Sequence, residues 1–326
     1  MPEKKTLSTL LVMGALAAVG ATTALAVEVY HRPMQVAFGA ARLLLRAKGA
    51  HEAICEIDGL PMHYLHAGKL REPVVLIHGL GGSAEAWVTL MPMLSHKFEV
   101  YAPDMPGFGY TPLAPGKQCI STHVAYLGHF LDALNAPQVT LVGHSLGGWI
   151  ALHYAAEHSA RVKRLYLLNS AGLMREGTFV PYAPDREAAR TYIQRLLCYY
   201  GPVPTFLLDA VVSVSREPAY SGFIANYDRT EEVDEILARI SVPTTIVWGT
   251  EDRIFPLTCA YDFHAGIPNS RLVLVPGVSH NSHTGAAKKV ARLIREDASK
   301  EDIARDQISK MKGETPAFEG NGKKKR

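Results

Sequence analysis

From residue 53 onward, short apolar runs alternate with amphipathic stretches along the chain. The first two runs, AICEI and LPMHYLH, are joined by Asp58-Gly59, a pair that supplies the positive φ angles of a two-residue hairpin turn. Six more runs follow: PVVLIHG, FEVYAPD, VTLVGHS, RLYLLNSAG, PTTIVWG and RLVLVPG. Most of these are continuous β-branched and aliphatic segments, as is typical of strands buried on both faces. The pattern predicts a hairpin followed by six buried strands.

Helical patterns lie between these strands, at residues 84–96, 122–135, 146–158 and about 285–296. Alternating strands and helices predict an α/β fold with a mostly parallel eight-stranded sheet flanked by helices. Residues 171–240 interrupt the alternation with apolar helical stretches punctuated by prolines and no convincing strand. We interpret them as a helical cap inserted into a core of residues 51–170 and 241–298. Because the insertion follows a strand end, we expect it on the active-site side of the sheet.

The N-terminus adds a possible membrane element. After a short segment, residues 1–6, residues 7–27 carry no charge and are long enough to cross a bilayer as a helix. We favour an uncleaved anchor. A signal peptide cleaved near Ala24-Leu25-Ala26, which would make the protein secreted or periplasmic, is the alternative, but the run exceeds the usual signal core of roughly 7 to 15 residues. Residues 28–50 predict an amphipathic linker helix, lying either in the headgroup region or against the domain. Basic residues flank the span on both sides, so its orientation stays open.

Composition narrows the remaining function classes. The formal net charge is only +3 and no basic patch interleaved with aromatic residues occurs, so nothing favours nucleic-acid binding. The four cysteines are widely spaced without a CxxC pair, which indicates neither a zinc site nor a disulfide framework. Residues 299–326 are polar and charged, which predicts a frayed helix and a disordered tail. The oligomeric state cannot be inferred.

One serine has the sequence setting of a nucleophile. Gly143-His144-Ser145-Leu146-Gly147 matches G-x-S-x-G where a buried strand turns into a helix. Such a turn strains the serine backbone and exposes its hydroxyl at the edge of the sheet. A serine hydroxyl is a poor nucleophile near neutral pH, so it needs a base and a group that orients the base. Asp252 and His280 each follow a later strand, in the order expected for this turn, and we predict that all three lie at one edge.

Several neighbouring residues compete for these roles or adjoin them. His283 lies three residues beyond His280, but we expect it to begin the last helix and face elsewhere, and Glu251 adjoins Asp252. Asp104 precedes the serine, so we expect it to pin its loop through backbone hydrogen bonds. His78 is expected to brace its loop, and His144 either lines the pocket or fills space. The aromatic cap residues could contact an acyl chain or form the cap's own core, which we favour for each one: Tyr192, Tyr199, Tyr200, Phe206 and Phe223.

These motifs together resemble the α/β-hydrolase superfamily. The resemblance runs from about residue 57 to the end of the last helix, and rests on five motifs in order: HGLGGSAEAW, PDMPGFGYT, GHSLGGW, WGTEDRIFP and PGVSH. Within the superfamily the chain looks most similar to membrane-anchored lipases and monoacylglycerol lipases, through its N-terminal span and the SAGL after the sixth strand. The family's W-G-x-x-D spacing selects Asp252 over Glu251.

The resemblance implies a catalytic assignment. Ser145 would be acylated, His280 would be the general base and then acid, and Asp252 would fix the imidazole tautomer. The backbone N–H groups of Leu80 and Leu146 would form the oxyanion hole. We therefore expect a membrane-anchored serine esterase or lipase acting on lipid-like acyl esters, with no cofactor or metal.

Other activities on the same fold stay open. Carbon–carbon bond hydrolases and cofactor-free haloperoxidases keep a serine at the elbow, so the motif does not separate them from an esterase. A non-catalytic binding protein of this fold is the alternative of a different class. The family's epoxide and haloalkane hydrolases use aspartate at the elbow, which Ser145 speaks against.

Overall fold

The computed structural model describes residues 26–69 and 72–313, of which residues 301–313 are described by their backbone alone. The predicted anchor at residues 7–27 falls almost entirely outside these residues, as do residues 1–6 and the end of the predicted tail. Among the helices of the described part, none is long and apolar enough to cross a membrane.

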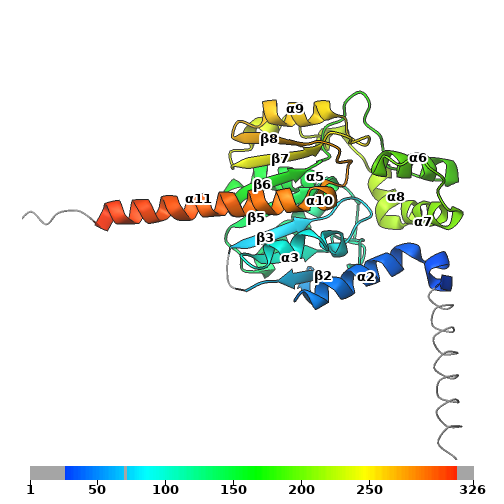
Figure 1. Cartoon of the computed structure of the whole chain (residues 1–326), viewed down its shortest axis with the longest axis horizontal. Coiled ribbons are helices and arrows are strands. Elements are labelled where there is room, and N and C mark those ends of the chain that lie inside the picture. The colour runs from blue at the N-terminus through cyan, green and yellow to red at the C-terminus, as the bar shows by residue number, and fades with distance from the viewer. Residues whose placement is uncertain (1–25, 70–71, 314–326) are drawn as a thin grey trace, which may run out of the picture.

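The core is one eight-stranded, mostly parallel sheet, as predicted (Figure 1). Its spatial order is β1-β2-β4-β3-β5-β6-β7-β8. The first two strands form the predicted antiparallel hairpin, closed by Asp58 and Gly59 at φ 51° and 76°. The strands are β1 (His51–Ile57), β2 (Leu60–Ala67), β3 (Pro73–Ile77), β4 (Glu99–Pro103), β5 (Val139–His144), β6 (Val162–Leu168), β7 (Thr244–Gly249) and β8 (Ser270–Val275). From β4 through β8 every neighbouring pair is parallel, so the carboxyl ends of these strands meet at one edge.

Helices cover both faces of the sheet. Alternation along β3 shows this directly, because Val75 and Ile77 belong to one apolar core and Val74 and Leu76 to another. The first core includes side chains of α4 (Ile120–Ala133), α5 (Leu146–Glu157) and α9 (Leu257–Gly266). The second includes side chains of α2 (Pro33–Ala47), η1 (Ala84–Trp87), α3 (Leu90–Leu94) and α11 (Ala287–Gly313).

Two predicted helices differ from the structure. The stretch predicted as one helix at residues 84–96 is divided into η1 and α3. The last predicted helix is the short α10 (Ser282–Gly285) followed by α11, which continues well past residue 299, where we expected fraying. On the exposed face of the packed part of α11, Arg292 and Glu296 lie one turn apart at 3.6 Å, an ion pair of the kind that supports a polar helix.

The cap is helical, as expected. It contains α6 (Arg186–Leu197), α7 (Thr205–Arg216), α8 (Pro218–Ala225), η3 (Arg229–Glu231) and η4 (Leu237–Arg239), and residues 171–240 contain no strand. Asp185 caps α6 by accepting a hydrogen bond of 2.9 Å from the Ala188 N–H. Ala183, Ala189, Leu208 and Val212 form a small apolar core of the cap's own. The cap stands beyond the carboxyl edge of the sheet (Figure 1).

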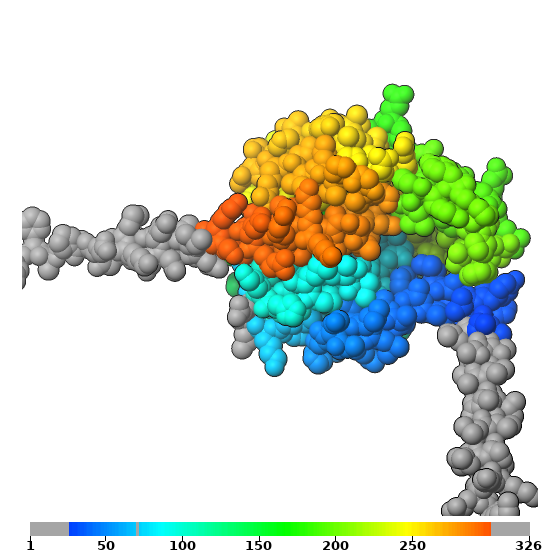
Figure 2. All heavy atoms as spheres, viewed as in Figure 1, coloured from blue at the N-terminus to red at the C-terminus, as the bar shows by residue number. Residues whose placement is uncertain are grey.

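The helix that follows the predicted anchor is packed on the domain. Leu45 of α2 is fully buried, and the Arg42 guanidinium pairs with Glu85 and with Glu52, at 3.2 Å for the latter. Arg42 also lies 3.9 Å above the Tyr110 ring. In the space-filling view the N-terminal helix meets the cap at one side of the molecule (Figure 2). Of the two arrangements considered for this helix, the structure has the packed one.

Candidate functional site

Ser145 occupies a strained turn between β5 and α5. Its backbone has φ 53° and ψ −119°, which a non-glycine residue seldom adopts. Gly143 and Gly147 make the turn possible, because a Cβ on Gly147 would lie 2.0 Å from the Ile77 carbonyl oxygen and one on Gly143 would lie 2.3 Å from that of Gly147. The turn is held by the Ser145 N–H, which donates to the Leu168 carbonyl oxygen at 3.1 Å. The structure thus has the nucleophile-elbow geometry that the motif predicts.

His78 braces the loop after β3, as predicted. Its Nδ1–H donates to the Gly79 carbonyl oxygen at 2.8 Å, and its Nε2 accepts from the Met105 N–H at 3.0 Å. Burial lowers the pKa of His78, which favours this neutral tautomer. A trans peptide points its C=O and N–H in opposite directions, so fixing the Gly79 carbonyl also fixes the direction of the Leu80 N–H. Leu146 is the first residue of α5, where backbone N–H groups have no acceptor within the helix.

Asp252 and His280 form a hydrogen-bonded pair at the same edge. Asp252 follows β7, His280 follows β8, and the carboxylate Oδ2 accepts a hydrogen bond of 2.9 Å from His280 Nδ1. The other oxygen, Oδ1, accepts from the backbone N–H groups of Ile254 at 2.8 Å and Phe255 at 3.1 Å. Both side chains are buried. With its proton on Nδ1, His280 presents a basic Nε2, and it lines one cavity with Ser145.

The rival residues are not part of the hydrogen-bonded pair, although His283 lines the same cavity as Ser145 and His280. The Glu251 side chain is 46% exposed and lies 3.5 Å from Arg253. His283 lies in the short α10 rather than at the start of the last helix, and, contrary to our expectation, it does not face elsewhere: its ring lies 5.5 Å from that of Trp87 and 4.1 Å from that of His144. Burial and the nearby His280 lower the pKa of His283 to about 3, so its imidazole is neutral. Neither residue replaces Asp252 or His280 in the pair.

Asp104 pins its loop, as predicted. It is fully buried and accepts hydrogen bonds from the Ala84 N–H at 2.7 Å, the Tyr110 N–H at 2.8 Å and His63 Nδ1 at 2.8 Å. Burial alone would raise the pKa of Asp104, but these donors and His78 lower it below its usual value. Its two oxygens therefore hold the loop beside Gly109.

Asn169 is a member of the site that we did not select from the sequence. Its Nδ2 donates to Asp252 Oδ2 at 2.6 Å and its Oδ1 accepts from the Gly249 N–H at 3.2 Å. It sits directly after β6 at φ 43°, a conformation that asparagine tolerates better than most residues. The sequence held one sign of this role, because Asn169 is a polar residue directly after a buried strand that lies beside β7. Asp252 thus accepts four hydrogen bonds and is held in one orientation.

His144 supports the loop that carries His280. Its Nε2–H donates to the His280 carbonyl oxygen at 3.1 Å. Burial, and then the neighbouring His283 and His280, lower the pKa of His144 well below its usual value, so the ring is a neutral donor. His144 also lines the cavity of Ser145. Of the two roles that the sequence left open, the structure shows pocket lining, and it adds the hydrogen bond to His280, which we did not predict.

Two cavities meet at Ser145. The first, which we call the cap cavity, has a volume of about 290 Å³ and lies between α5 and the cap. Its walls are largely apolar and include Trp149, Met174, Phe179, Phe223, Ile224 and Phe255. The second, which we call the α2 groove, has a volume of about 750 Å³ and also contains His280. Of the aromatic cap residues, Phe223 is buried in the cap cavity, Tyr192 lines the α2 groove, and Tyr199 and Tyr200 are 48% and 68% exposed.

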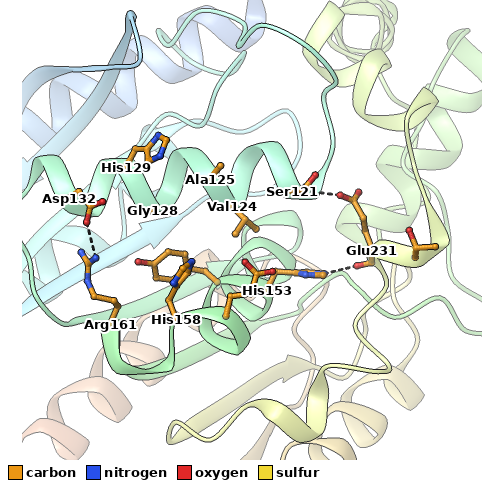
Figure 3. A pocket seen from close by; sticks show the side chains of 13 residues that line it. Ser121, Val124, Ala125, Gly128, His129, Asp132, His153, His158, Arg161 and Glu231 are labelled. Carbon is orange, nitrogen blue, oxygen red and sulfur yellow. Dashed lines mark hydrogen bonds and ion pairs between the residues drawn. The ribbon is translucent and has the colours of Figure 1, made fainter.

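A third cavity, of about 470 Å³, lies between α4 and α5 and contains none of the three predicted catalytic side chains (Figure 3). At its rim Glu231 accepts hydrogen bonds from the first backbone N–H groups of α4, at 2.9 Å from Ser121 and 3.2 Å from Ile120. The Glu231 carbonyl oxygen accepts from Trp149 Nε1 and His153 Nε2, both at 2.7 Å. This cavity marks where the cap is fastened to α4 and α5. In the described residues no group of three or more His, Cys, Asp or Glu side chains is placed to hold a metal ion.

Comparisons with known proteins agree with this geometry. A family model described as the alpha/beta hydrolase fold matches residues 72–193. A 2-hydroxy-6-oxo-6-(2'-aminophenyl)hexa-2,4-dienoic acid hydrolase of Metapseudomonas resinovorans is 30% identical over 250 residues, which cover 70% of this chain and 84% of the relative.

Solved structures include both lipid and carbon–carbon hydrolases. A bacterial membrane phospholipase A has a TM-score of 0.72 at 20% identity, covering 88% of this chain and 97% of its own, and shows the shared fold. A meta-cleavage product hydrolase of Pseudomonas fluorescens IP01 has a TM-score of 0.66 at 25% identity, covering 76% of this chain and 98% of its own. The comparisons as a whole favour the carbon–carbon alternative over the lipase interpretation.

Proposed function

Because the chain belongs to the α/β hydrolase family, we propose that it is a serine hydrolase of apolar, lipid-like acyl esters. The observation that carries this proposal is the lining of the space around Ser145. Apolar side chains dominate the cap cavity, and no lysine or arginine is among the described residues that line either it or the α2 groove. An apolar acyl chain can be buried there without leaving a charge unpaired.

In the proposed reaction, His280 Nε2 accepts the proton of Ser145 as its Oγ attacks the ester carbonyl carbon. The Leu80 and Leu146 N–H groups donate to the oxyanion, and each such donor is typically worth about 3 kcal/mol in the transition state. His280 then protonates the departing alcohol. A water molecule, deprotonated by His280, hydrolyses the acyl-enzyme. Asp252 keeps the imidazole proton on Nδ1 and stabilises the imidazolium.

A carbon–carbon bond hydrolase is the second candidate, and the names of the relatives favour it. The substrate named for the Metapseudomonas relative is a dienoic acid. At neutral pH such an acid carries a carboxylate, which an apolar site accommodates only with a cation or several hydrogen-bond donors. The α2 groove offers hydrogen-bond donors but no Lys or Arg within the described residues, and the cap cavity is lined almost entirely by apolar side chains. On the apolar lining of the cap cavity we place the ester first.

We further propose that residues 7–27 anchor the enzyme at a membrane from which it draws its substrate. Their uncharged composition supports this, since about 20 apolar residues are enough to span a bilayer.

A substrate panel tests the proposal. Full-length protein in one detergent is assayed with a monoacylglycerol, a p-nitrophenyl ester series and 2-hydroxy-6-oxo-6-(2'-aminophenyl)hexa-2,4-dienoic acid, beside Ser145→Ala. We expect ester turnover that Ser145→Ala abolishes and that exceeds turnover of the dienoate. Cleavage of the dienoate without ester turnover would replace the proposal by the second candidate. Folded protein that turns over neither would contradict both.

A further inference from the structure

The catalytic groups are distributed unequally between the two cavities that meet at Ser145. Ser145 and Leu80 line both the cap cavity and the α2 groove, whereas Leu146 lines only the cap cavity and His280 lines only the α2 groove. The nucleophile therefore stands at the junction, with the general acid on one side. An ester likewise has two limbs that diverge from the carbonyl carbon, the acyl chain and the alcohol.

We propose that the α2 groove is the binding site for the alcohol limb and that α2 forms its specificity-determining wall. This inference rests on the proposed ester hydrolysis. The leaving oxygen must receive a proton from His280, so it has to lie within hydrogen-bond reach of Nε2. His280 faces the α2 groove, and the alcohol therefore departs into that groove. The acyl limb is left with the cap cavity, whose apolar side chains suit a hydrocarbon chain.

The wall formed by α2 is a single apolar stripe. Met34, Ala37, Phe38 and Ala41 line the groove, and their spacing of three and four residues places them on one face of the helix. Leu196 and Leu197 of α6 line the groove as well. These side chains give the groove the apolar contacts that a long alcohol needs.

The loop after β8 gives the same groove a polar part. Ser279 and Asn281 of this loop line it beside His280, and Thr284 of the following α10 lines it as well. A groove with polar groups beside the general acid and apolar groups on α2 suits an amphiphilic alcohol, with hydroxyl or ester groups near the bond that is cleaved and hydrocarbon farther away. The substrate class that fits is an acyl ester of glycerol with a further apolar substituent.

Contacts within the protein hold the α2 wall in place. Arg42, with its partners Glu85 and Glu52, and the buried Leu45 fix the C-terminal half of the helix. Just before the N-terminal end of α2, the Tyr30 ring lies 5.7 Å from that of Phe206 in α7. Figure 1 shows α2 running from the edge of the sheet toward the cap. Asp252 is bonded to Asn169 and His280, and no α2 residue takes part in these hydrogen bonds. Substitutions on the stripe therefore alter the space for the alcohol and leave the triad in place.

The test compares two ester series on full-length protein in one detergent. The alcohol series is butanoate esterified with methanol, hexanol and decanol, and the acyl series is methyl butanoate, octanoate and decanoate. Ala41→Trp fills the α2 groove. Ala40→Trp is the matched control, since residue 40 is exposed on the same helix and does not line the groove. Met174→Trp is the reciprocal variant in the cap cavity, and Met34→Trp replaces Ala41→Trp if that variant does not fold.

We expect Ala41→Trp to lower kcat/KM for decyl butanoate by about tenfold or more, because even one methylene is worth about tenfold in a close-fitting apolar site. In the same variant, kcat/KM for the methyl esters should change less than about twofold. Ala40→Trp should leave kcat/KM unchanged in both series, and Met174→Trp should lower it for the long acyl chains alone. Equal loss on both series, or no loss on decyl butanoate, would overturn the assignment while leaving ester hydrolysis intact. Wild-type protein that hydrolyses neither series removes the proposed function, and the inference with it.

Discussion

Replacing Asn169 with aspartate is a direct probe of how the acid of the triad is held. The Asn169 amide donates to Asp252 Oδ2 at 2.6 Å, inside a buried site. Asn169→Asp keeps the size of the side chain and the tolerance for φ 43°, but it replaces the donor by a second carboxyl group. The variant therefore isolates the effect of charge at this position.

The magnitude follows from Coulomb's law. Two carboxylates about 4 Å apart repel by about 4 kcal/mol at an effective dielectric constant of about 20, which corresponds to about three pH units of proton binding. In the folded variant the pair retains one proton until near neutral pH, whereas an aspartate in the unfolded chain loses its proton near pH 4. The folded state binds the proton more tightly, so the variant's stability is retained at low pH and is lost as the pH rises.

Urea unfolding at pH 5 and pH 8 measures this effect. The difference in unfolding free energy between wild type and Asn169→Asp should widen by about 2 to 3 kcal/mol over that interval. The shared proton also competes for the oxygen that orients His280, so kcat should fall by about 10² or more. This loss is smaller than the roughly 10⁴-fold loss seen when the acid of a catalytic triad is neutralised in another enzyme.

Asn135→Asp is the matched control. Asn135 also has a positive φ, of 50°, but its side chain is exposed, so we expect a difference from wild type that does not vary with pH. A stability difference for Asn169→Asp that stays constant or narrows from pH 5 to pH 8, or a kcat equal to that of wild type, would show that Asn169 does not hold Asp252 in this way.

Three further perturbations have defined outcomes. Asp104→Asn should lower the unfolding free energy by about 3 kcal/mol at pH 7, because a buried pair with His63 is broken. Since the folded state lowers the pKa of Asp104, the difference from wild type in urea unfolding should shrink as the pH falls below about 4; a difference that stays constant would count against the pairing. Glu231→Ala should lower the unfolding free energy by about 1 kcal/mol, because α4 loses its cap. Ester turnover should stay within about twofold of wild type, because the backbone carbonyl that accepts from Trp149 remains, and a large loss of kcat would contradict this. His283→Phe should leave the fall of kcat/KM toward acidic pH, measured between pH 5 and pH 8, unchanged, because the pKa of His283 is about 3 and its ring is already neutral. A shift of this fall along the pH axis would show that His283 titrates with the catalytic groups.

The sheet and the meeting of Ser145, Asp252 and His280 were accessible from the sequence because each depends on local patterns. Continuous apolar runs mark the buried strands, and parallel strands bring their carboxyl ends to one edge, so three residues placed just after such runs had to converge. The roles of His78 and Asp104 as loop braces followed from the same positional reasoning.

Asn169 and the α2 stripe were not accessible in this way. The hydrogen bond from Asn169 to Asp252 joins residues 83 positions apart, and it depends on β6 lying beside β7 in the finished sheet. The placement of Met34 and Phe38 in the same groove as His280 depends on the docking of α2, which the sequence left open between lipid and protein. The length of α11 was underestimated because its charged residues resemble those of a disordered tail.

If Ser145 is an activated nucleophile, a fluorophosphonate will label it, and mass spectrometry of the labelled full-length protein will map the adduct. We expect a single adduct on the peptide that contains Ser145, formed rapidly in wild type, slowed strongly in His280→Ala and absent in Ser145→Ala. Folded wild-type protein that remains unlabelled, or that is labelled on another residue, would contradict it.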